Sequence, residues 1–293
     1  QIQSSLKLMM IAQREKIDIA LGSTFSVAHL PILTKAKSII LDDDDDEVVP
    51  LFVKFGHTFA TDILSPDCLK RKSPKTIYYP GYHELAYLHP NRFTPDPSVL
   101  DKVGVREGED YFILRFNAFK AYHDIGEEGL SWQQKLELIQ ILKPLGRVFI
   151  TSEREVREEF LPYKINADPG LFHSLLAYAK LFIGDSQTTV SEAAVLGIPA
   201  LRCNSFAGRI SYHAEEEGYG LVYSFLPADF DKLKGKLKEI LSIGDLRQEW
   251  QKRRVRMLGD KIDFTAFLFW FIENYPKSKG VIENKPEFWE RFK

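Results

Sequence analysis

Residues 183–201 read IGDSQTTVSEAAVLGIPAL, and this stretch decides the fold. Its pattern predicts a strand, a polar turn, a short helix, a Gly-Pro break and a second strand. The turn places Ser186, Thr188 and Thr189 at the start of the helix, where unpaired backbone N–H groups and the helix dipole favour an anion such as a phosphate. Glu192 follows within two helical turns, where a carboxylate can reach a sugar hydroxyl. A diphosphate at the helix start with an acid nearby suits a nucleotide sugar.

Strand-like and helical segments alternate on both sides of this stretch, which indicates an α/β fold with parallel sheets. Strands are expected at residues 17–21, 38–41, 61–64, 75–79, 111–116, 147–150, 181–183 and 221–223. Helices are expected at residues 4–16, 25–35, 48–59, 131–142, 171–179, 227–242, 245–258 and 263–274. Polar clusters follow several of these strands, at the sheet edge where such folds bind ligands.

The domain organisation follows from a proline-rich polar stretch at residues 88–97, which is typical of an interdomain connection. We expect a Rossmann-like domain at residues 1–90 and a second one at residues 91–262, with a cleft between them. Residues 263–293 should form a helix and tail that pack back on the first domain. Because the chain opens on a helix rather than a strand, we expect the start of the first domain to be missing.

Composition narrows the classes of function. The 293 residues carry a net charge of -2 without basic runs, which argues against nucleic-acid binding. Two distant cysteines, Cys68 and Cys203, fit a reducing, cytoplasmic compartment. No apolar run approaches the ~20 residues of a membrane span. The aromatic run at residues 264–272 predicts a buried helix, with a surface that rests on a membrane as the alternative. The sequence leaves the oligomeric state open.

Several motifs together carry a family resemblance. They are residues 81–90 (GYHELAYLHP), 113–116 (ILRF), 123–126 (HDIG), 184–199 and 202–208 (RCNSFAG). On these motifs nearly the whole chain resembles the family called domain of unknown function 354. That family is similar to GT-B glycosyltransferases and to non-hydrolysing UDP-N-acetylglucosamine 2-epimerases. The resemblance implies a GT-B-like fold, with two Rossmann-like parallel-sheet domains that face a cleft and a truncated N-terminal domain.

The resemblance also implies a nucleotide site in the second domain. In the 2-epimerases the matching segment reads Asp-Ser-Gly-Gly-x-Gln-Glu-Glu, whose Ser and Gly backbone holds the diphosphate and whose last Glu holds the ribose. Here Ser186 and Glu192 match, while Gln187 and Thr188 replace the glycines, so hydroxyl and amide contacts would substitute for close backbone approach. Thr189 completes this predicted set.

Two further loops contribute to the predicted site. The loop after the first strand of the second domain carries Arg115 and Asn117 as expected phosphate contacts and His123 as an expected general acid/base or phosphate donor. Arg209, in the loop that follows a later strand, could clamp a phosphate or form a surface salt bridge.

An acidic run at residues 42–47 leaves the end of an apolar strand. Asp45 and Glu47 match the Asp-x-Glu pattern of the resembling family, which makes them the expected catalytic carboxylates. Crowded carboxylates raise one another's pKa, which suits a general acid or base. A solvated turn and a Mg²⁺ or Ca²⁺ site are the alternatives; we expect no metal site, because GT-B enzymes generally do not chelate metal through such a motif. His83, near the connection, is expected to pack rather than react.

Three functions stay open at this point. The first is transfer of a sugar from a nucleotide-diphosphate sugar, of UDP type, to a glycan or small-molecule acceptor, with no tightly bound cofactor. The second is epimerisation of the nucleotide sugar at its 2-position. The third is a non-catalytic binding protein that has kept the GT-B shell.

Overall fold

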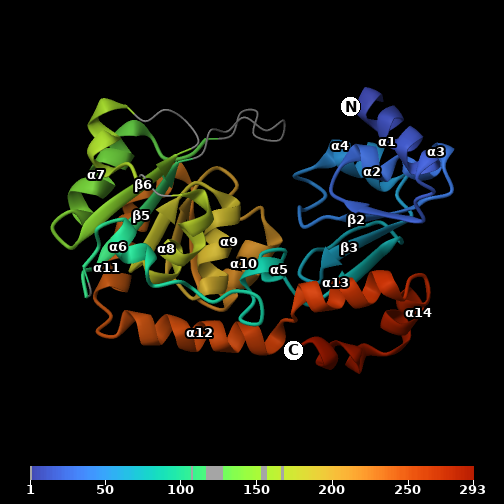
Figure 1. Cartoon of the computed structure of the whole chain (residues 1–293). Coiled ribbons are helices and arrows are strands. Elements are labelled where there is room, and N and C mark those ends of the chain that lie inside the picture. The colour runs from blue at the N-terminus through green and yellow to red at the C-terminus, as the bar shows by residue number, and fades with distance from the viewer. Residues whose placement is uncertain (1, 107, 117–127, 153–156, 166–167) are drawn as a thin grey trace. The chain divides into compact units, whose positions relative to one another are not determined.

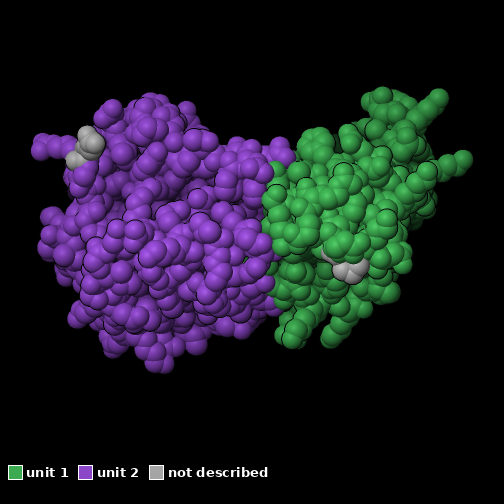
Figure 2. Space-filling model, turned by 90° about the horizontal axis from the view of Figure 1, so that it is seen from below, with its two compact units in different colours: residues 1–83, 261–293 green, residues 84–260 purple. Residues whose placement is uncertain are grey.

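The computed structural model describes residues 2–106, 108–116, 128–152, 157–165 and 168–293. The chain divides into two compact units (Figures 1 and 2). Unit 1 comprises residues 1–83 and 261–293, and unit 2 comprises residues 84–260. Helix α5 (Leu85–Leu88) belongs to unit 2, where it packs against another helix of that unit.

Unit 1 is built on a four-stranded parallel sheet with the order β1-β2-β3-β4. Its strands are β1 (Ile19–Gly22), β2 (Lys37–Leu41), β3 (Asp62–Pro66) and β4 (Thr76–Tyr79). Its helices are α1 (Ile2–Arg14), α2 (Phe25–Ala28), α3 (Leu30–Leu33) and α4 (Pro50–Phe52), and a π-helix at Val53–His57 continues α4. The helix expected at residues 25–35, with an interruption near Pro31, is two short helices that meet at His29, and Pro31 lies in the first turn of the second.

The C-terminal segment belongs to unit 1 and contains α13 (Phe264–Glu273) and α14 (Lys277–Asn284). Phe264 stacks on Tyr79 of β4 with ring centroids 4.4 Å apart. Tyr275 and Lys279 both donate to the carboxylate of Asp62 in β3. The aromatic run is thus a helix packed on its own unit, as the first of the two interpretations predicted. Within the part of the chain that the structure describes, no helix is both long and apolar enough to cross a membrane.

Unit 2 contains a five-stranded parallel sheet with the order β6-β5-β7-β8-β9. Its strands are β5 (Tyr111–Phe116), β6 (Arg147–Ser152), β7 (Leu181–Gly184), β8 (Ala200–Cys203) and β9 (Val222–Phe225). The chain steps outward to β6, crosses back over β5 and then proceeds through β7 in the other direction. The sheet therefore has a topological switch point between β5 and β7, the place where open α/β sheets bind ligands outside the carboxyl ends of the strands.

The helices of unit 2 include the one that the opening stretch predicted. They are α5, α6 (Val99–Lys102), α7 (Trp132–Leu142), α8 (Phe172–Tyr178), α9 (Gln187–Leu196), α10 (Ser211–Gly218), α11 (Phe230–Leu241) and α12 (Leu246–Asp260). Helix α9 packs against α8, α10, α12 and strands β7 and β8, so all its residues from Thr189 onward are buried. It ends at Gly197, whose φ of 72° is left-handed and whose missing Cβ leaves room for Gln251 and Arg254.

Candidate functional site

The switch point brings the ends of β5 and β7 into close contact. Arg115 of β5 lies opposite Gly184 of β7, and the Asp185 amide donates to the Arg115 carbonyl at 3.3 Å. A Cβ on Gly184 would lie 2.7 Å from that carbonyl, so only glycine fits here. The Asn204 amide group donates to the Asp185 carbonyl at 2.9 Å and ties the loop after β8 to the same edge.

Helix α9 begins at this edge. Ser186 is its N-cap and accepts from the Thr189 amide at 3.4 Å, while the two hydroxyl groups are 3.2 Å apart. Ser186 and Thr189 are buried, whereas Gln187 is half-buried and Thr188 is exposed. Backbone N–H groups of a first helical turn have no acceptor within the helix, and the dipole adds positive potential. The start of α9 can therefore receive an anion, with Gln187 and Thr188 as the accessible side chains.

Glu192 lies on α9 with its side chain only 10% exposed. Its Oε1 atom accepts from the Tyr87 hydroxyl at 3.0 Å and from His173 Nε2 at 2.8 Å. The three side chains come from α5, α8 and α9, and the His173 ring also contacts the rings of Phe93 and Phe172. The sequence singled out Glu192 but neither partner, because Tyr87 is 105 residues away and His173 is 19 residues away.

Arginines near this edge differ in their accessibility. The Arg115 guanidinium lies over the Phe172 ring at 5.8 Å, at the start of α8. Arg209 is exposed and lies over Phe206 at 5.0 Å. Arg202 is buried in β8 and donates to Ser224, so it faces the protein rather than a ligand. The other two predicted residues of this region, Asn117 and His123, lie outside the described residues.

A second buried acid lies on α9's neighbour α10. Glu216 accepts from the Ser191 hydroxyl and from His213 Nδ1, and both Glu216 and His213 are fully buried. Burial raises the pKa of Glu216 well above its usual value and lowers that of His213 well below its own. The hydrogen bond from Ser191 to Glu216 joins α9 to α10.

The acidic run of unit 1 wraps around one arginine. The Arg71 side chain is 1% exposed and contacts the carboxylates of Asp42 and Asp46 at 3.2 and 2.9 Å. It also donates to the carbonyls of Asp42 and Asp44 and to the Ser65 hydroxyl. His57 Nε2 donates to the same Asp42 carboxylate at 2.7 Å. Two carboxylates of the run are thus paired with a cation inside the protein.

Two carboxylates of the run remain nearer the surface. Asp43 pairs with His83 at 3.0 Å, and the His83 ring stacks against Tyr79 and Phe264. Burial works to raise the pKa of Asp43, but the charge and hydrogen bond of His83 outweigh it and lower that pKa. Burial and the charges of Asp43 and Asp42 raise the pKa of Asp44 to about 7. Asp44 is thus able to take up and release a proton near neutral pH.

Asp45 and Glu47 are the residues of this run that the sequence predicts as catalytic carboxylates. The Asp45 carbonyl accepts from the amides of Val48 and Val49, which turns the chain away from the strand. Glu47 is exposed. The role of these two residues stays a prediction, while the geometry draws attention to Asp43, Asp44 and His83 instead.

A metal-binding site is the alternative interpretation of the same acidic run. Carboxylate oxygens of Asp42, Asp43 and Asp44 lie within 4.8 Å of one another. However, Asp42 already serves both Arg71 and His57, so a divalent cation would compete with a buried guanidinium for this ligand. The arrangement is typical of an ion-paired turn.

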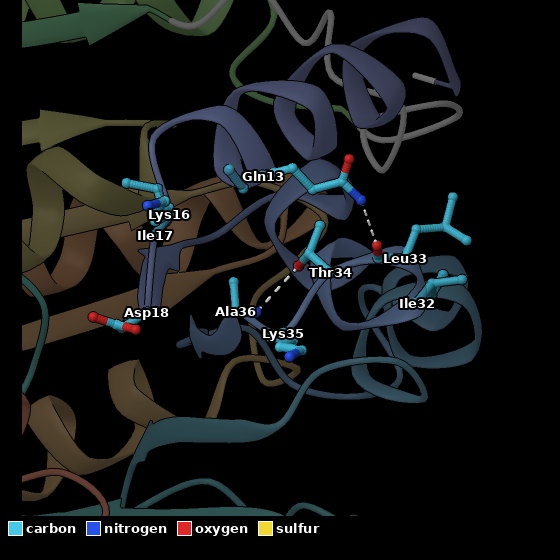
Figure 3. Close-up of a pocket in the computed structure, with 10 residues that line it drawn as sticks. Gln13, Lys16, Ile17, Asp18, Ile32, Leu33, Thr34, Lys35 and Ala36 are labelled. Atoms are coloured by element: carbon cyan, nitrogen blue, oxygen red, sulfur yellow. Dashed lines mark hydrogen bonds between the residues drawn. The ribbon is translucent and has the colours of Figure 1, made fainter.

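Each unit also has a cavity at the amino ends of its strands. One of about 610 Å³ in unit 1 is lined by residues around Gln13, Asp18 and Thr34 (Figure 3). One of about 240 Å³ in unit 2 is lined by residues around Asp110 and Lys180. Asp18, Asp110 and Lys180 each immediately precede a strand, so both cavities lie at amino ends, away from the edge where parallel sheets bind ligands.

Comparison with solved structures shows what this architecture is similar to. The S. aureus MnaA-UDP co-structure has a TM-score of 0.58 at 14% identity, over 85% of this chain and 72% of that chain. The UDP-GlcNAc 2-epimerase from Methanocaldococcus jannaschii has a TM-score of 0.56 at 14% identity, over 82% and 75%. The spinosyn forosaminyltransferase SpnP has a TM-score of 0.56 at 16% identity, over 87% and 76%.

These likenesses confirm the predicted fold class, a GT-B-like arrangement of two parallel-sheet α/β domains. Identities at this level support a shared fold and nothing finer. No family model matches the sequence, and no curated protein does either. Membership of the family called domain of unknown function 354 therefore stays a prediction.

Proposed function

We propose that this chain is a nucleotide-sugar-dependent glycosyltransferase whose unit 2 binds the nucleoside diphosphate. The observation that carries the proposal is the Glu192 carboxylate, nine-tenths buried on the helix that begins at the switch point of the sheet. A buried acid held in place by two hydrogen bonds is suited to recognise sugar hydroxyls. The start of α9 then receives the diphosphate, with the cationic Arg115 on the neighbouring strand.

The transfer reaction requires a carboxylate that accepts the proton of the acceptor near neutral pH. In glycosyl transfer an acceptor hydroxyl oxygen forms a bond to the anomeric carbon while the bond from that carbon to the diphosphate oxygen breaks. The acceptor proton must leave as the bond forms, and Asp44 is the group of the acidic run whose pKa of about 7 suits a general base. The Asp43–His83 pair fixes the neighbouring charge that contributes to this pKa.

Epimerisation at the sugar 2-position is the second candidate. It requires a group that removes a proton from carbon and returns one. Asp44 supports this as well, because a pKa of about 7 populates both protonation states at neutral pH. The similar structures include a UDP-GlcNAc 2-epimerase and a spinosyn forosaminyltransferase, so the fold accompanies both chemistries.

The first test is nucleotide binding. Calorimetry with UDP, GDP, dTDP and CMP should show saturable binding of one nucleotide. Glu192→Ala should weaken that binding by about 1–3 kcal/mol, as expected for loss of hydrogen bonds to a charged group. Glu137→Ala, on α7 and paired with Lys234, is the control that should leave binding unchanged. If none of these nucleotides binds, the proposal is overturned.

The second test separates the two reactions. A transferase releases nucleoside diphosphate in proportion to acceptor, whereas an epimerase exchanges the hydrogen at C2 with deuterium from the solvent. Asp44→Asn should abolish either turnover and leave nucleotide binding intact. Asp18→Asn, at the amino edge of the same sheet, should leave turnover unchanged. Full turnover by Asp44→Asn would remove Asp44 from the mechanism.

A further inference from the structure

One side of unit 1 exposes many large apolar side chains. Among the described residues, eleven of the eighteen large apolar side chains that are exposed lie in residues 2–59. The helices of this segment, α1 to α4, lie on one side of the sheet of unit 1, with α13 on the other (Figure 1). Single exposed apolar side chains are normal on a protein surface, whereas a contiguous group marks a surface that contacts a partner.

The exposed apolar residues of α1 form a stripe beside its buried residues. Ile2, Leu6 and Met10 are 79%, 48% and 61% exposed, and they recur every four residues, so they lie along one side of the helix. Met9 belongs instead to a buried cluster with Leu30 of α3. Because successive helical residues are about 100° apart, the exposed stripe adjoins the buried one. The apolar sector of α1 is therefore wider than its packing on unit 1 requires.

The stripe of α1 adjoins the exposed end of α3. Gln13 Nε2 of α1 donates to the Leu33 carbonyl at 2.8 Å (Figure 3). The Leu33 side chain is 59% exposed and the neighbouring Ile32 is 48% exposed. Two helices thus present apolar side chains next to each other.

The π-helix after α4 and the turn that follows it extend the same surface. His29 Nε2 donates to the Phe55 carbonyl at 2.7 Å, and the His29 ring lies 5.4 Å from that of Phe59. On its other side, His29 Nδ1 lies 3.2 Å from the Ser5 hydroxyl of α1. Phe55 and Phe59 are 47% and 41% exposed. The apolar helical surface of unit 1 is therefore formed by Ile2, Leu6, Met10, Ile32, Leu33, Phe55 and Phe59.

The charges on these elements are mainly positive. Helix α1 contains Lys7 and Arg14 and no acidic residue, and Lys54 lies over the Phe55 ring at 5.2 Å. Glu15 directly follows α1 and pairs with Arg14, while the acidic run at residues 42–47 lies outside these helices, between β2 and α4. A two-fold contact with a second copy would bring the cations of α1 together, whereas anionic lipid headgroups attract them.

We propose that the apolar helical surface of unit 1 binds the surface of an anionic lipid bilayer. The apolar side chains enter the boundary between headgroups and acyl chains, and Lys7 and Lys54 meet the phosphates of the headgroups. Binding of this kind requires no helix to cross the bilayer. It is also independent of the proposed nucleotide site, because it concerns unit 1 and where the protein works.

Flotation of the full chain with vesicles tests the proposal. Vesicles with about one third phosphatidylglycerol in phosphatidylcholine should bind the protein at least about tenfold more strongly than pure phosphatidylcholine, and salt should weaken the binding. The double substitution of Leu6→Gln with Met10→Gln should reduce binding by roughly tenfold or more, since two half-exposed apolar side chains are lost. Phe55→Gln, on a different element, should also reduce it. Lys7→Gln should reduce it by roughly fivefold.

Helix α12 of unit 2 offers the matched controls. Val255 is 67% exposed and Lys252 is exposed on the same helix, so Val255→Gln and Lys252→Gln remove an apolar group and a charge elsewhere. Both should leave vesicle binding unchanged. Circular dichroism should show that all variants are folded, because every substituted side chain is exposed.

Three results would overturn the inference. The first is no binding to anionic vesicles, or equal binding to neutral ones. The second is a loss in the α12 variants that equals the loss in the variants of unit 1. The third is a concentration-dependent dimer in sedimentation that the double substitution in α1 abolishes, without any vesicle binding, which would assign the surface to a second copy of the chain.

Discussion

Unit 1 and unit 2 handle buried carboxylates in different ways. In unit 2, Glu192 is a single acid held by two donors, Tyr87 and His173, with one oxygen left over. In unit 1, the buried guanidinium of Arg71 contacts the carboxylates of Asp42 and Asp46, two of six consecutive acids, and two backbone carbonyls. The first arrangement fixes one carboxylate with two neutral or cationic donors, and the second pairs two carboxylates of an acidic run with one buried cation. The difference shows that a dense run of acidic residues in a sequence does not indicate which carboxylates are free to interact with a ligand.

The largest expected effect concerns Arg71. Arg71→Met should destabilise the protein by about 3–5 kcal/mol, because Asp42 is left buried without its cation. Urea unfolding followed by circular dichroism measures this loss. Arg14→Ala breaks an exposed pair with Glu15 and should change stability by no more than ~1 kcal/mol. Equal losses in both variants would mean that the acidic run does not depend on Arg71.

The second prediction concerns pH. The pKa of Asp44 is about 7 in the folded protein and about 3.9 in an unfolded chain, so between these values the folded state binds more protons. Stability should therefore fall as the pH rises from about 4 to about 7. Asp44→Asn removes this decline and should be more stable than the parent at pH 8, by on the order of 1–3 kcal/mol. Thermal unfolding of the parent and the variant at pH 4 and pH 8 checks the sign. A stability difference between the two proteins that is the same at both pH values would contradict the prediction.

The smallest expected effect compares two helix caps. Ser186→Ala in unit 2 and Thr24→Ala in unit 1 each remove a side-chain acceptor for a backbone amide. Each should lower stability by about 0.5–2 kcal/mol. Only Ser186→Ala should also weaken nucleotide binding, because only α9 begins at the switch point. Calorimetry on both variants separates the two roles, and equal binding by both would show that the cap of α9 is purely structural.

Much of the fold could be predicted from the sequence, because strands of parallel sheets leave local apolar runs. The expected strand at residues 111–116 is β5, and the expected helix at residues 131–142 is α7, whose N-cap Ser131 forms a full capping box with Gln134. Short polar helices were not predicted. α10 buries only Tyr212, His213 and Glu216, and its other residues are polar, small or charged, so its local pattern resembles a surface loop.

The candidate site was predicted in part. Glu192 could be found because it stands in an apolar helix, whereas His173 and Tyr87 meet it only through tertiary packing of three helices. In the acidic run, an Asp-x-Glu spacing pointed to Asp45 and Glu47. No local pattern could reveal that Arg71, 25 residues from Asp46, would reorganise the run and bring Asp43 to His83.

The order of the strands in unit 2 has a consequence for folding kinetics. The site edge forms only when β5 pairs with β7, and the paired residues Phe112 and Leu181 are about seventy positions apart in the chain. Closing a loop of that length costs entropy before any contact compensates for it. We therefore expect the start of α9 to acquire its protected amide hydrogens late in refolding, after α11 and α12, which can form from local interactions. Pulsed hydrogen exchange during refolding would resolve this order.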